Sequence, residues 1–389
     1  MKLNVLFFLS ILITITTIGQ QRQLSTQAEI SVLTVGPGTN LNDAFGHNGF
    51  RIKDHQLGLD IVYGYGQYDF DTPNFYLKFA QGKLNYLISK HSFSNFYKTY
   101  KYYDRTIDEQ VLNLSASEKQ KLYDYLINNY KPENRRYLYD FFYDNCATRI
   151  RDVAKGTTDN NITFSTPSNY EPKTFRQLIH EHVGLNTWGS FGIDLALGSV
   201  IDRKAKPYDQ MFLPKYIHEF FGETKIGNSK KLVKKSTTIY KKKKLNTTEN
   251  FIWSPLMILT LIAALILFVT YKDRKHNRLS KWLDVIVFGL TGVLGILMLF
   301  LWLGTNHSAT AQNYNMLWAF PLNLLMIRQL LKTQTKNWFK SYLKFLIIML
   351  CLLTLHWSIG VQVFSIALIP LLIALFLRYI YILKYFNRN

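Results

Sequence analysis

Apolar segments fill the C-terminal third of this 389-residue chain, and they constrain its fold more than any other feature. Five of them follow one another, at 251–271, 283–303, 314–331, 341–358 and 361–383. An α-helix needs about 20 apolar residues to cross a bilayer. The third and fourth segments are short and require tilt or support from neighbouring helices. We therefore expect residues 251–389 to form an all-α membrane domain of five transmembrane helices.

The loops between these segments alternate between basic and neutral composition. Lysine and arginine cluster after the first segment, after the third and at the C-terminus, whereas the loop 304–313 has neither. Basic loops stay in the cytoplasm during membrane insertion, so the sequence predicts a cytoplasmic C-terminus and an exported N-terminal part. The net charge of +20 is concentrated in membrane-flanking segments, which argues against nucleic-acid binding.

The first 19 residues support the same topology. Lys2 is followed by an uncharged, mostly apolar run from Leu3 to Gly19, and the small residues Thr17 and Gly19 stand where a signal peptidase cleaves. We predict a secretory signal over 1–19. An uncleaved anchor helix is the alternative, and either one exports the segment that follows.

Eight lysines precede the first apolar segment, on the predicted outer side. They fall within 226–250, where we expect a basic tether next to the membrane. Long exported domains cross the membrane largely regardless of charge, so the topology stands. Two interpretations remain open: a solvated linker, or attraction to anionic lipid headgroups worth about 1 kcal/mol per lysine.

Residues 20–225 have the pattern of an exported α+β domain. Strands are expected at Ser31–Val35, Phe50–Lys53, Asp60–Tyr65 and Thr106–Leu112, and helices from Ser115 to Lys131 and at Lys173–Val183. The helix at Ser115 carries the clearest signal, because Ser115-x-x-Glu118 is a capping box ahead of apolar residues at helical spacing. Lys131-Pro132 marks its end.

Two short stretches have chemical character. His47 stands at the start of a predicted strand with Gly46 and Gly49 close by, which lets the backbone turn and leaves the imidazole uncrowded. Cys146 follows Asp144 and Asn145, two good N-cap residues, at the start of a predicted helix. A structural histidine and a small buried cysteine are the alternatives.

The position of Cys146 favours reactivity. The chain has only two cysteines, so no disulfide framework is expected and Cys146 is predicted to be a free thiol. The first turn of a helix favours the thiolate through its dipole and its free N–H groups. Together with His47, this indicates a cysteine nucleophile paired with a histidine base.

Several motifs together resemble one known family. They are Gly46-His47, Tyr63-Gly64-Tyr65-Gly66 with Tyr68-Asp69-Phe70, Asn145-Cys146-x-Thr148-Arg149-x-Arg151-Asp152, Gly192-Ile193-Asp194-x-x-Leu197-Gly198 and Met211-Phe212-Leu213-Pro214. Histidine before cysteine is the order of circularly permuted papain-like enzymes. The set, followed by five apolar segments, resembles the Bacteroides-type lipoprotein N-acyltransferase (Lnb) family.

The resemblance implies a multi-pass enzyme of the bacterial inner membrane whose papain-like catalytic domain lies in the periplasm. Such an enzyme takes a fatty acyl chain from a phospholipid donor and delivers it to the α-amine of the lipidated N-terminal cysteine of a diacylated apolipoprotein. His47 would deprotonate Cys146, and the acyl chain would pass through a thioester.

The third catalytic residue is less clear from the residues. Asp60, Tyr63 and Tyr65 lie on the strand after the histidine, where a polar orienting residue is usual, and we favour Tyr65. Near the cysteine, Asn145 is either a cap or a substrate contact. Arg149 and Arg151 either meet a phosphate or form salt bridges with Asp152 or another nearby acid.

The neutral loop before the third apolar segment contains a second polar cluster. His307, Asn313 and Asn315 either hold lipid headgroups and complete the active site, or belong to an ordinary polar loop. His356 is a weaker candidate of the same kind. No cofactor is expected, and no metal either, since the cysteines are not paired at ligand spacing and His180-x-His182 lacks further ligands nearby.

Two other functions use the same features. A membrane-tethered cysteine hydrolase would use Cys146 and His47 with water as the acceptor, on lipid or on peptidoglycan. A non-catalytic scaffold would use the domain only to bind a partner. Activity without membrane attachment would favour the hydrolase, and a biological effect that survives Cys146→Ser would favour the scaffold.

Overall fold

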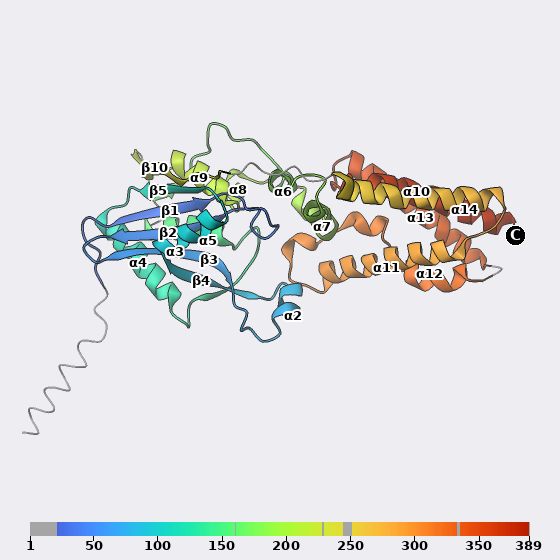
Figure 1. Ribbon diagram of the computed structural model, residues 1–389, viewed down its shortest axis with the longest axis horizontal. Helices are drawn as coiled ribbons and strands as arrows, with labels where there is room; N and C mark the ends of the chain where they lie inside the picture. Colours follow the sequence, from blue (N-terminus) through green and yellow to red (C-terminus); the bar gives the residue numbers. More distant parts are fainter. Residues whose placement is uncertain (1–21, 160, 228, 244–250, 333–334, 389) are drawn as a thin grey trace, which may run out of the picture.

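The computed structural model describes residues 22–159, 161–227, 229–243, 251–332 and 335–388. The predicted signal segment 1–19 and the last part of the predicted tether, 244–250, lie outside these ranges. Within them, a domain built on a β-sheet is followed by an elongated helical domain (Figure 1). The described α and β elements of the first domain confirm the expected α+β class.

A seven-stranded antiparallel sheet forms the centre of the first domain. Its order is β10-β5-β1-β2-β3-β4-β6. The strands are β1 (Glu29–Val35), β2 (His47–Asp54), β3 (Leu59–Tyr68), β4 (Asn85–Ser92), β5 (Ile107–Leu112), β6 (Arg136–Leu138) and β10 (Val233–Tyr240). A small second sheet consists of β7 (Ile162–Thr163), β8 (Lys225–Ile226) and β9 (Lys230–Lys231).

Helices pack on both faces of the large sheet. The helices of this domain are α2 (Phe75–Ala80), α3 (Phe93–Tyr102), α4 (Ala116–Tyr130), α5 (Cys146–Thr157), α6 (Phe175–Val183), α7 (Trp188–Ala196), η1 (Ser199–Ile201), α8 (Pro207–Gln210) and α9 (Pro214–Glu223). Of these, α3 packs on one face of the sheet, and α4, α5 and α9 pack on the other. Side chains alternate across a strand, so Val62 of β3 joins Phe96 of α3 on one face. Tyr63 and Tyr65 pack on the other face, in the main core with α4, α5 and α9.

The predicted helix at Ser115 is confirmed together with its capping box. The Ser115 hydroxyl accepts from the Glu118 N–H at 3.2 Å, and the Ser115 N–H donates to the Glu118 carboxylate at 2.7 Å. The helix ends at Tyr130, followed by extended Lys131. Local hydrogen bonding of this kind is readable from sequence because both partners lie within one turn.

The segment expected as a solvated tether is different in the structure. From Val233 to Tyr240 it forms β10, an edge strand that pairs with β5. Thr238 and Tyr240 donate from their hydroxyls to Asp108 and to Asp104 at 2.6 and 2.7 Å. The lysines obscured the β-branched residues between them, although lysine is common on exposed edge strands because it discourages pairing with other chains.

The helical domain differs from the five-helix expectation at its third segment. Its elements are η2 (Phe251–Trp253), α10 (Pro255–Lys275), α11 (Lys281–Leu303), η3 (Ser308–Thr310), η4 (Tyr314–Leu317), α12 (Asn323–Leu330), α13 (Asn337–Ser358) and α14 (Leu368–Arg388). In the part of the chain that is described, four helices are long and apolar enough to cross a membrane: α10, α11, α13 and α14.

The predicted span 314–331 is broken into η4 and the short helix α12. At about 1.5 Å per residue α12 is too short to cross a bilayer alone. The interrupted stretch around Pro321 packs against α11, where a Cβ at Gly295 would lie 2.2 Å from the carbonyl oxygen of Ala319. The Asn323 amide donates to Thr291 of α11 at 2.8 Å. Glycine on α11 thus lets the backbone around Pro321 approach closely, which the number of apolar residues in 314–331 does not indicate.

A buried ion cluster joins three of the long helices. Arg378 of α14 donates to Asp273 of α10 at 2.8 Å and to Asp284 of α11 at 2.7 Å, and all three side chains are fully buried. The Ser280 hydroxyl donates to the same Asp273 carboxylate at 2.7 Å. Buried charges are tolerated when they are paired and hydrogen-bonded, so the cluster fixes how α10, α11 and α14 associate.

Candidate active site

A cavity of about 580 Å³ lies where the two domains meet. The sheet domain contributes His47 and Cys146, and the helical domain contributes the loop at His307. Most of its wall is apolar, with the side chains of Leu41, Phe45, Tyr68, Phe79, Leu84, Tyr86, Phe141, Ile179, Ile193, Leu197 and Leu213. A largely apolar cavity with a few polar groups is typical of a binding site.

Cys146 is the first residue of α5, as predicted, and it is a free, half-buried thiol. Burial raises the pKa of this thiol. The backbone N–H groups of Asn48 and Ala147 and the charge of Arg105 act in the opposite direction and lower the pKa. The resting side chain is therefore a protonated thiol, in surroundings that stabilise the thiolate once a base removes the proton.

His47 is the first residue of β2 and faces the same cavity. Burial, with the nearby charges of Arg105 and His91, lowers the pKa of its imidazole to about 4. The imidazole is thus neutral at pH 7 and able to accept a proton. In the described parts of the chain no hydrogen bond joins His47 to Cys146, and catalytic hydrogen bonds often tighten only when substrate binds.

Two glycines make room for His47. Gly46 has φ +86°, and a Cβ there would lie 2.6 Å from the carbonyl oxygen of Val35. A Cβ at Gly64 of β3 would lie 3.0 Å from the His47 Nε2. Both glycines belong to the motifs of the sequence, and their roles here are a positive φ and space for the imidazole.

Arg105 is a functional candidate that the sequence did not reveal. Its guanidinium is buried, donates from Nε to the Gly36 carbonyl at 2.9 Å, and lies 5.0 Å from the centre of the Tyr100 ring. Its Nη1 is 3.7 Å from Asp43, and its Nη2 has no hydrogen-bond partner among the described residues. Arg105 stands between α3 and β5, outside every motif, so only the folded arrangement places it near Cys146 and His47.

Tyr65 does not have the position expected of a third catalytic residue. Its ring lines the cavity, but its hydroxyl donates to Asn129 of α4 at 2.7 Å. The alternatives are also engaged elsewhere, because Asp60 pairs with Arg51 at 2.7 Å and the ring of Tyr63 packs against Tyr130. The polar partner expected for His47 on β3 is therefore not supplied by any of the three.

The polar side chains next to Cys146 are engaged within the protein. Asn145 also lines the cavity, so its expected substrate contact stays a prediction, whereas Arg149 and Arg151 are not among the lining residues. Asn145 caps α5 by accepting from the N–H groups of Ala147 and Thr148, and its amide donates to the carbonyls of Phe141 and Phe212. Arg149 forms an ion pair with Asp144, and Arg151 with Asp152 at 2.7 Å. Both arginines are neutralised by carboxylates, which was the alternative to phosphate binding.

The loop after α11 reaches the sheet domain at His307. The Asn306 N–H donates to the Gln81 carbonyl at 2.8 Å, the Ser308 hydroxyl donates to Asp140 at 2.7 Å, and the His307 Nε2 lies 3.2 Å from the Ala80 carbonyl. Through these contacts the helical domain forms one wall of the cavity that contains Cys146.

Asn313 and Asn315 join the domains and are not placed to hold a headgroup. Both are almost fully buried. The Asn313 amide donates to the Leu195 carbonyl at 2.7 Å, and the Asn315 amide donates to the Asp194 carbonyl at 2.8 Å. Their donors are used on the backbone of α7, which corrects the expectation of a substrate contact.

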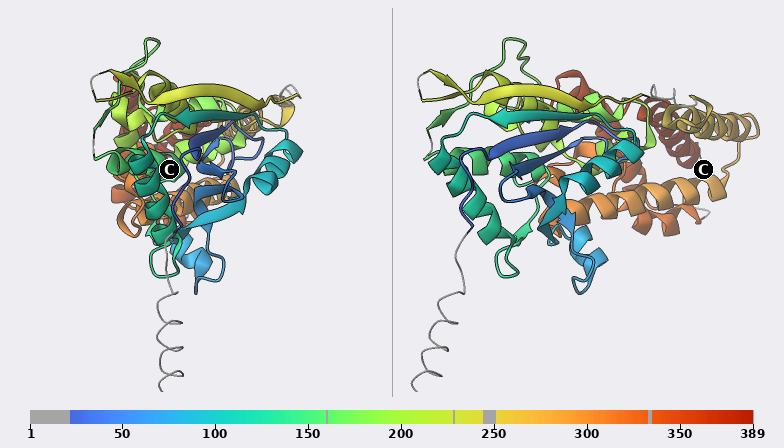
Figure 2. Two further views of the ribbon diagram at one scale, coloured as in Figure 1. Left: turned by 90° about the vertical axis from the view of Figure 1, so that its left-hand side faces the viewer. Right: turned by 60° about the vertical axis from the view of Figure 1, so that its left-hand side comes forward.

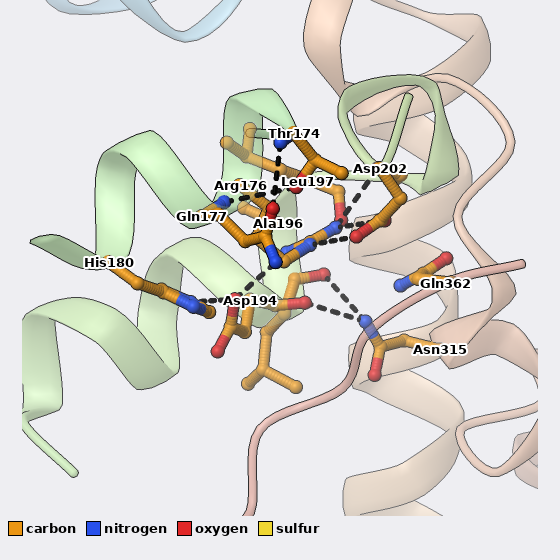
Figure 3. Close-up of polar contacts among 12 residues, drawn as sticks. Thr174, Arg176, Gln177, His180, Asp194, Ala196, Leu197, Asp202, Asn315 and Gln362 are labelled. Carbon is orange, nitrogen blue, oxygen red and sulfur yellow. Dashed lines mark hydrogen bonds and ion pairs between the residues drawn. The ribbon is translucent and has the colours of Figure 1, made fainter. Parts of the chain in front are cut away.

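A buried arginine holds the same stretch from the other side (Figure 3). Arg176 of α6 donates to Asp194 at 2.8 Å and to Asp202 at 2.9 Å, and His180 lies 2.9 Å from Asp194. The Arg176 Nη2 also donates to the carbonyl of Leu197 at 3.1 Å. Because α7 lines the cavity, this network and the two asparagines together fix the cavity wall.

Comparisons with known families match both domains. Residues 19–181 match the Lnb N-terminal periplasmic domain, and residues 246–389 match the Lnb transmembrane domain. The chain belongs to the Lnb family. The resemblance found in the sequence is thereby confirmed, and the chain is a multi-pass inner-membrane protein with a periplasmic domain. Comparisons with curated proteins and with solved structures gave no match.

The Lnb periplasmic match includes both His47 and Cys146, whereas α7 lies between the two matched regions. The permuted papain-like arrangement expected for an Lnb domain stays a prediction. In the ranges that the structure describes, no group of three or more histidine, cysteine, aspartate or glutamate side chains is placed to hold a metal ion.

Proposed function

We propose that the protein is a lipoprotein N-acyltransferase. It takes a fatty acyl chain from a membrane phospholipid, carries it as a thioester on Cys146, and transfers it to the α-amine of the diacylglyceryl-cysteine of an apolipoprotein. Membership of the Lnb family supports this reaction. The observation that carries it is the cavity, in which an apolar wall, a free cysteine and a neutral histidine meet at the junction with the membrane domain.

The apolar wall suits an acyl chain. Phe45, Phe141 and Ile193 face a space continuous with Cys146. Each square ångström of apolar surface removed from water contributes about 25 cal/mol, so a bound chain is stabilised along its length without charged contacts. The ester carbonyl carbon at the end of that chain is then held beside the thiol.

In the first half-reaction His47 accepts the proton of Cys146, and the sulfur attacks the ester carbonyl carbon of the phospholipid. The C–O ester bond breaks, and the proton from His47 passes to the departing alcohol oxygen of the lysophospholipid. The N–H groups of Asn48 and Ala147 and the charge of Arg105 stabilise negative charge on the sulfur.

In the second half-reaction the neutral α-amine of the acceptor attacks the thioester carbon. A C–N bond forms, the C–S bond breaks, and His47 relays the amine proton to the departing sulfur, which regenerates the thiol. The amide product keeps the acyl chain, and the enzyme returns to its starting state.

The membrane domain supports this chemistry by location. Donor and acceptor both reside in the bilayer, so a site held at its surface meets them at a high effective concentration. The four long helices anchor the cavity there, and the loop at His307 forms part of it. A soluble hydrolase would need neither the helices nor a cavity wall made by them.

Mass spectrometry of a lipoprotein N-terminal peptide tests the proposal. Cells that lack the protein are complemented with wild type, Cys146→Ser or His47→Ala, and Cys351→Ser serves as the matched control because Cys351 is exposed on α13. We expect one additional amide-linked acyl chain with wild type and Cys351→Ser only. Equal peptide masses in all strains would refute the acyltransferase.

A further inference from the structure

The loop that connects the antiparallel strands β3 and β4, called the hairpin below, exposes apolar side chains at the domain junction. It comprises residues 69–82 and contains α2, in which no residue is buried. Phe70 is 72% exposed, Tyr76 83%, Leu77 56% and Phe79 47%. Four large apolar side chains within so short a segment of an otherwise well-packed domain indicate a surface that another apolar phase covers.

The hairpin is tied to the membrane domain. The Gln81 carbonyl accepts from the Asn306 N–H at 2.8 Å, and the Ala80 carbonyl lies 3.2 Å from the His307 Nε2. Both partners follow α11 directly, three and four residues after its last residue Leu303. In Figure 1 α2 lies at the end of the sheet domain next to the loop that follows α11, and in Figure 2 this light-blue segment extends below the rest of the sheet domain. The hairpin therefore lies at the level where α11 leaves the bilayer.

A second exposed apolar group stands at the start of α10. Phe251 is 57% exposed, Ile252 60% and Trp253 69%. The indole N–H of Trp188, itself 53% exposed, donates to the Trp253 carbonyl at 2.8 Å. Aromatic side chains concentrate at the membrane–water interface, where their apolar rings and polar edges are both accommodated.

We propose that the hairpin 69–82 inserts into the headgroup region of the outer leaflet of the inner membrane, at the same depth as Phe251–Trp253. The occupant of its apolar surface is lipid. Continuity with the spanning helices favours lipid over a protein partner, because the hairpin is bonded to the loop that emerges from the bilayer. Lys78 lies between Leu77 and Phe79, and Lys83 follows the hairpin directly, so both can meet the phosphates of that region.

This inference goes beyond the proposed function, because it states which surface meets lipid. Phe79 and Gly82 of the hairpin also line the cavity of Cys146. An inserted hairpin places that wall of the cavity within the leaflet, so a phospholipid acyl chain reaches Cys146 from the side of the bilayer without crossing water.

Spin-label accessibility of the full chain in bilayer nanodiscs of phosphatidylethanolamine and phosphatidylglycerol tests the hairpin. A nitroxide is attached through Tyr76→Cys in a Cys146→Ser, Cys351→Ser background. The matched control is Asn128→Cys, an exposed site on α4. In Figure 1 α4 lies on the side of the sheet domain away from the membrane helices. We expect the label at position 76 to collide more with oxygen than with a water-soluble nickel complex, and the control to show the reverse.

A water-type signal at position 76 would overturn the inference. A label shielded from both reagents would also overturn it, because a protein would then cover the surface. If the Tyr76→Cys chain does not fold, Leu77→Cys replaces it on the same helix with the same criteria. The measurement does not depend on acyl transfer, so it remains decisive even if the proposed reaction is refuted.

Discussion

The two sides of the cavity are held in different ways. Cys146 and His47 stand at the start of a helix and of a strand, where caps and neighbouring strands within the sheet domain fix them. The opposite wall, α7 and the loop at His307, depends on hydrogen bonds between residues 118 and 121 positions apart in the chain. The positions of Cys146 and His47 are therefore set within the periplasmic domain, whereas the shape of the cavity depends on docking of the membrane domain.

The largest effect on acyl transfer is expected for substitutions of His47 and Cys146. His47→Ala should lower acyl transfer by about 10²–10⁴-fold, since the base that removes the thiol proton is lost. Cys146→Ser should abolish the thioester. Transfer to a synthetic diacylated lipopeptide, followed by mass spectrometry of trapped Cys146, measures both. A His47→Ala protein with full activity would contradict the assignment.

The pH dependence of Cys146 alkylation tests the protonation state of Cys146 and His47. Because the pKa of the Cys146 thiol is raised by burial and that of His47 lies near 4, the resting pair is thiol and neutral imidazole. Alkylation of Cys146 by iodoacetamide should therefore rise with pH through the neutral range. A high rate that is already constant at pH 5 would instead show a preformed thiolate–imidazolium pair.

Arg105→Gln should have an intermediate effect. Arg105 lowers the pKa of Cys146, so its loss should raise that pKa and move the alkylation profile to higher pH. A shift of one pKa unit makes alkylation at pH 7 about 10-fold slower. Lys121→Gln, at an exposed ion pair on α4, is the control. An unchanged profile would show that Arg105 does not act on the thiol.

A smaller effect on acyl transfer is expected where the membrane domain contacts α7. Asn315→Ala leaves the buried Asp194 carbonyl without its donor at a cost of about 1–3 kcal/mol. We expect faster hydrogen exchange in α7 and a few-fold lower transfer, with the alkylation rate of Cys146 unchanged. Asn128→Ala, at an exposed site, controls for general destabilisation. Slower alkylation in Asn315→Ala would mean that the two sides of the cavity are not independent.

The smallest effect is expected for Tyr65→Phe. The hydroxyl donates to Asn129 and not to His47, so its removal should cost about 1 kcal/mol of stability and leave transfer within about twofold of wild type. Thermal unfolding and the lipopeptide assay measure the two quantities. A loss of transfer as large as that of His47→Ala would restore Tyr65 as the third catalytic residue.

The features that sequence predicted are those with local causes. Ser115 and Asn145 are caps whose partners lie two or three residues away, and the α+β pattern follows from alternation along each strand. The sequence also placed Cys146 and His47 at the starts of their elements. Both residues face one cavity. This arrangement depends on packing between distant parts of the chain, which the periodicity of the sequence does not predict.

The features that sequence missed have distant partners. The hydroxyl of Tyr65 donates to α4, the amide of Asn313 donates to α7, and Arg105 acts on Cys146 from the segment between α3 and β5. The third apolar segment has enough hydrophobicity to span, but its backbone breaks where it packs against the glycines of α11. The many lysines of 226–250 likewise indicated a tether, although its β-branched residues form the strand β10. In each case the deciding partner is more than 20 positions away.

The buried cluster of Arg378, Asp273 and Asp284 has a consequence for biogenesis. The two carboxylates belong to α10 and α11, which a ribosome makes first, whereas the guanidinium that neutralises them belongs to α14, the last helix to be made. Asp273 already has Arg278 at 3.5 Å and the Ser280 hydroxyl as partners when α10 and α11 are made, whereas the charge of Asp284 is paired by Arg378. Until α14 arrives, Asp284 is an acid that resists leaving the insertion machinery for lipid. The bundle is thus closed by its final helix, and a chain that stops before Leu368 would present an unfinished membrane domain to quality control.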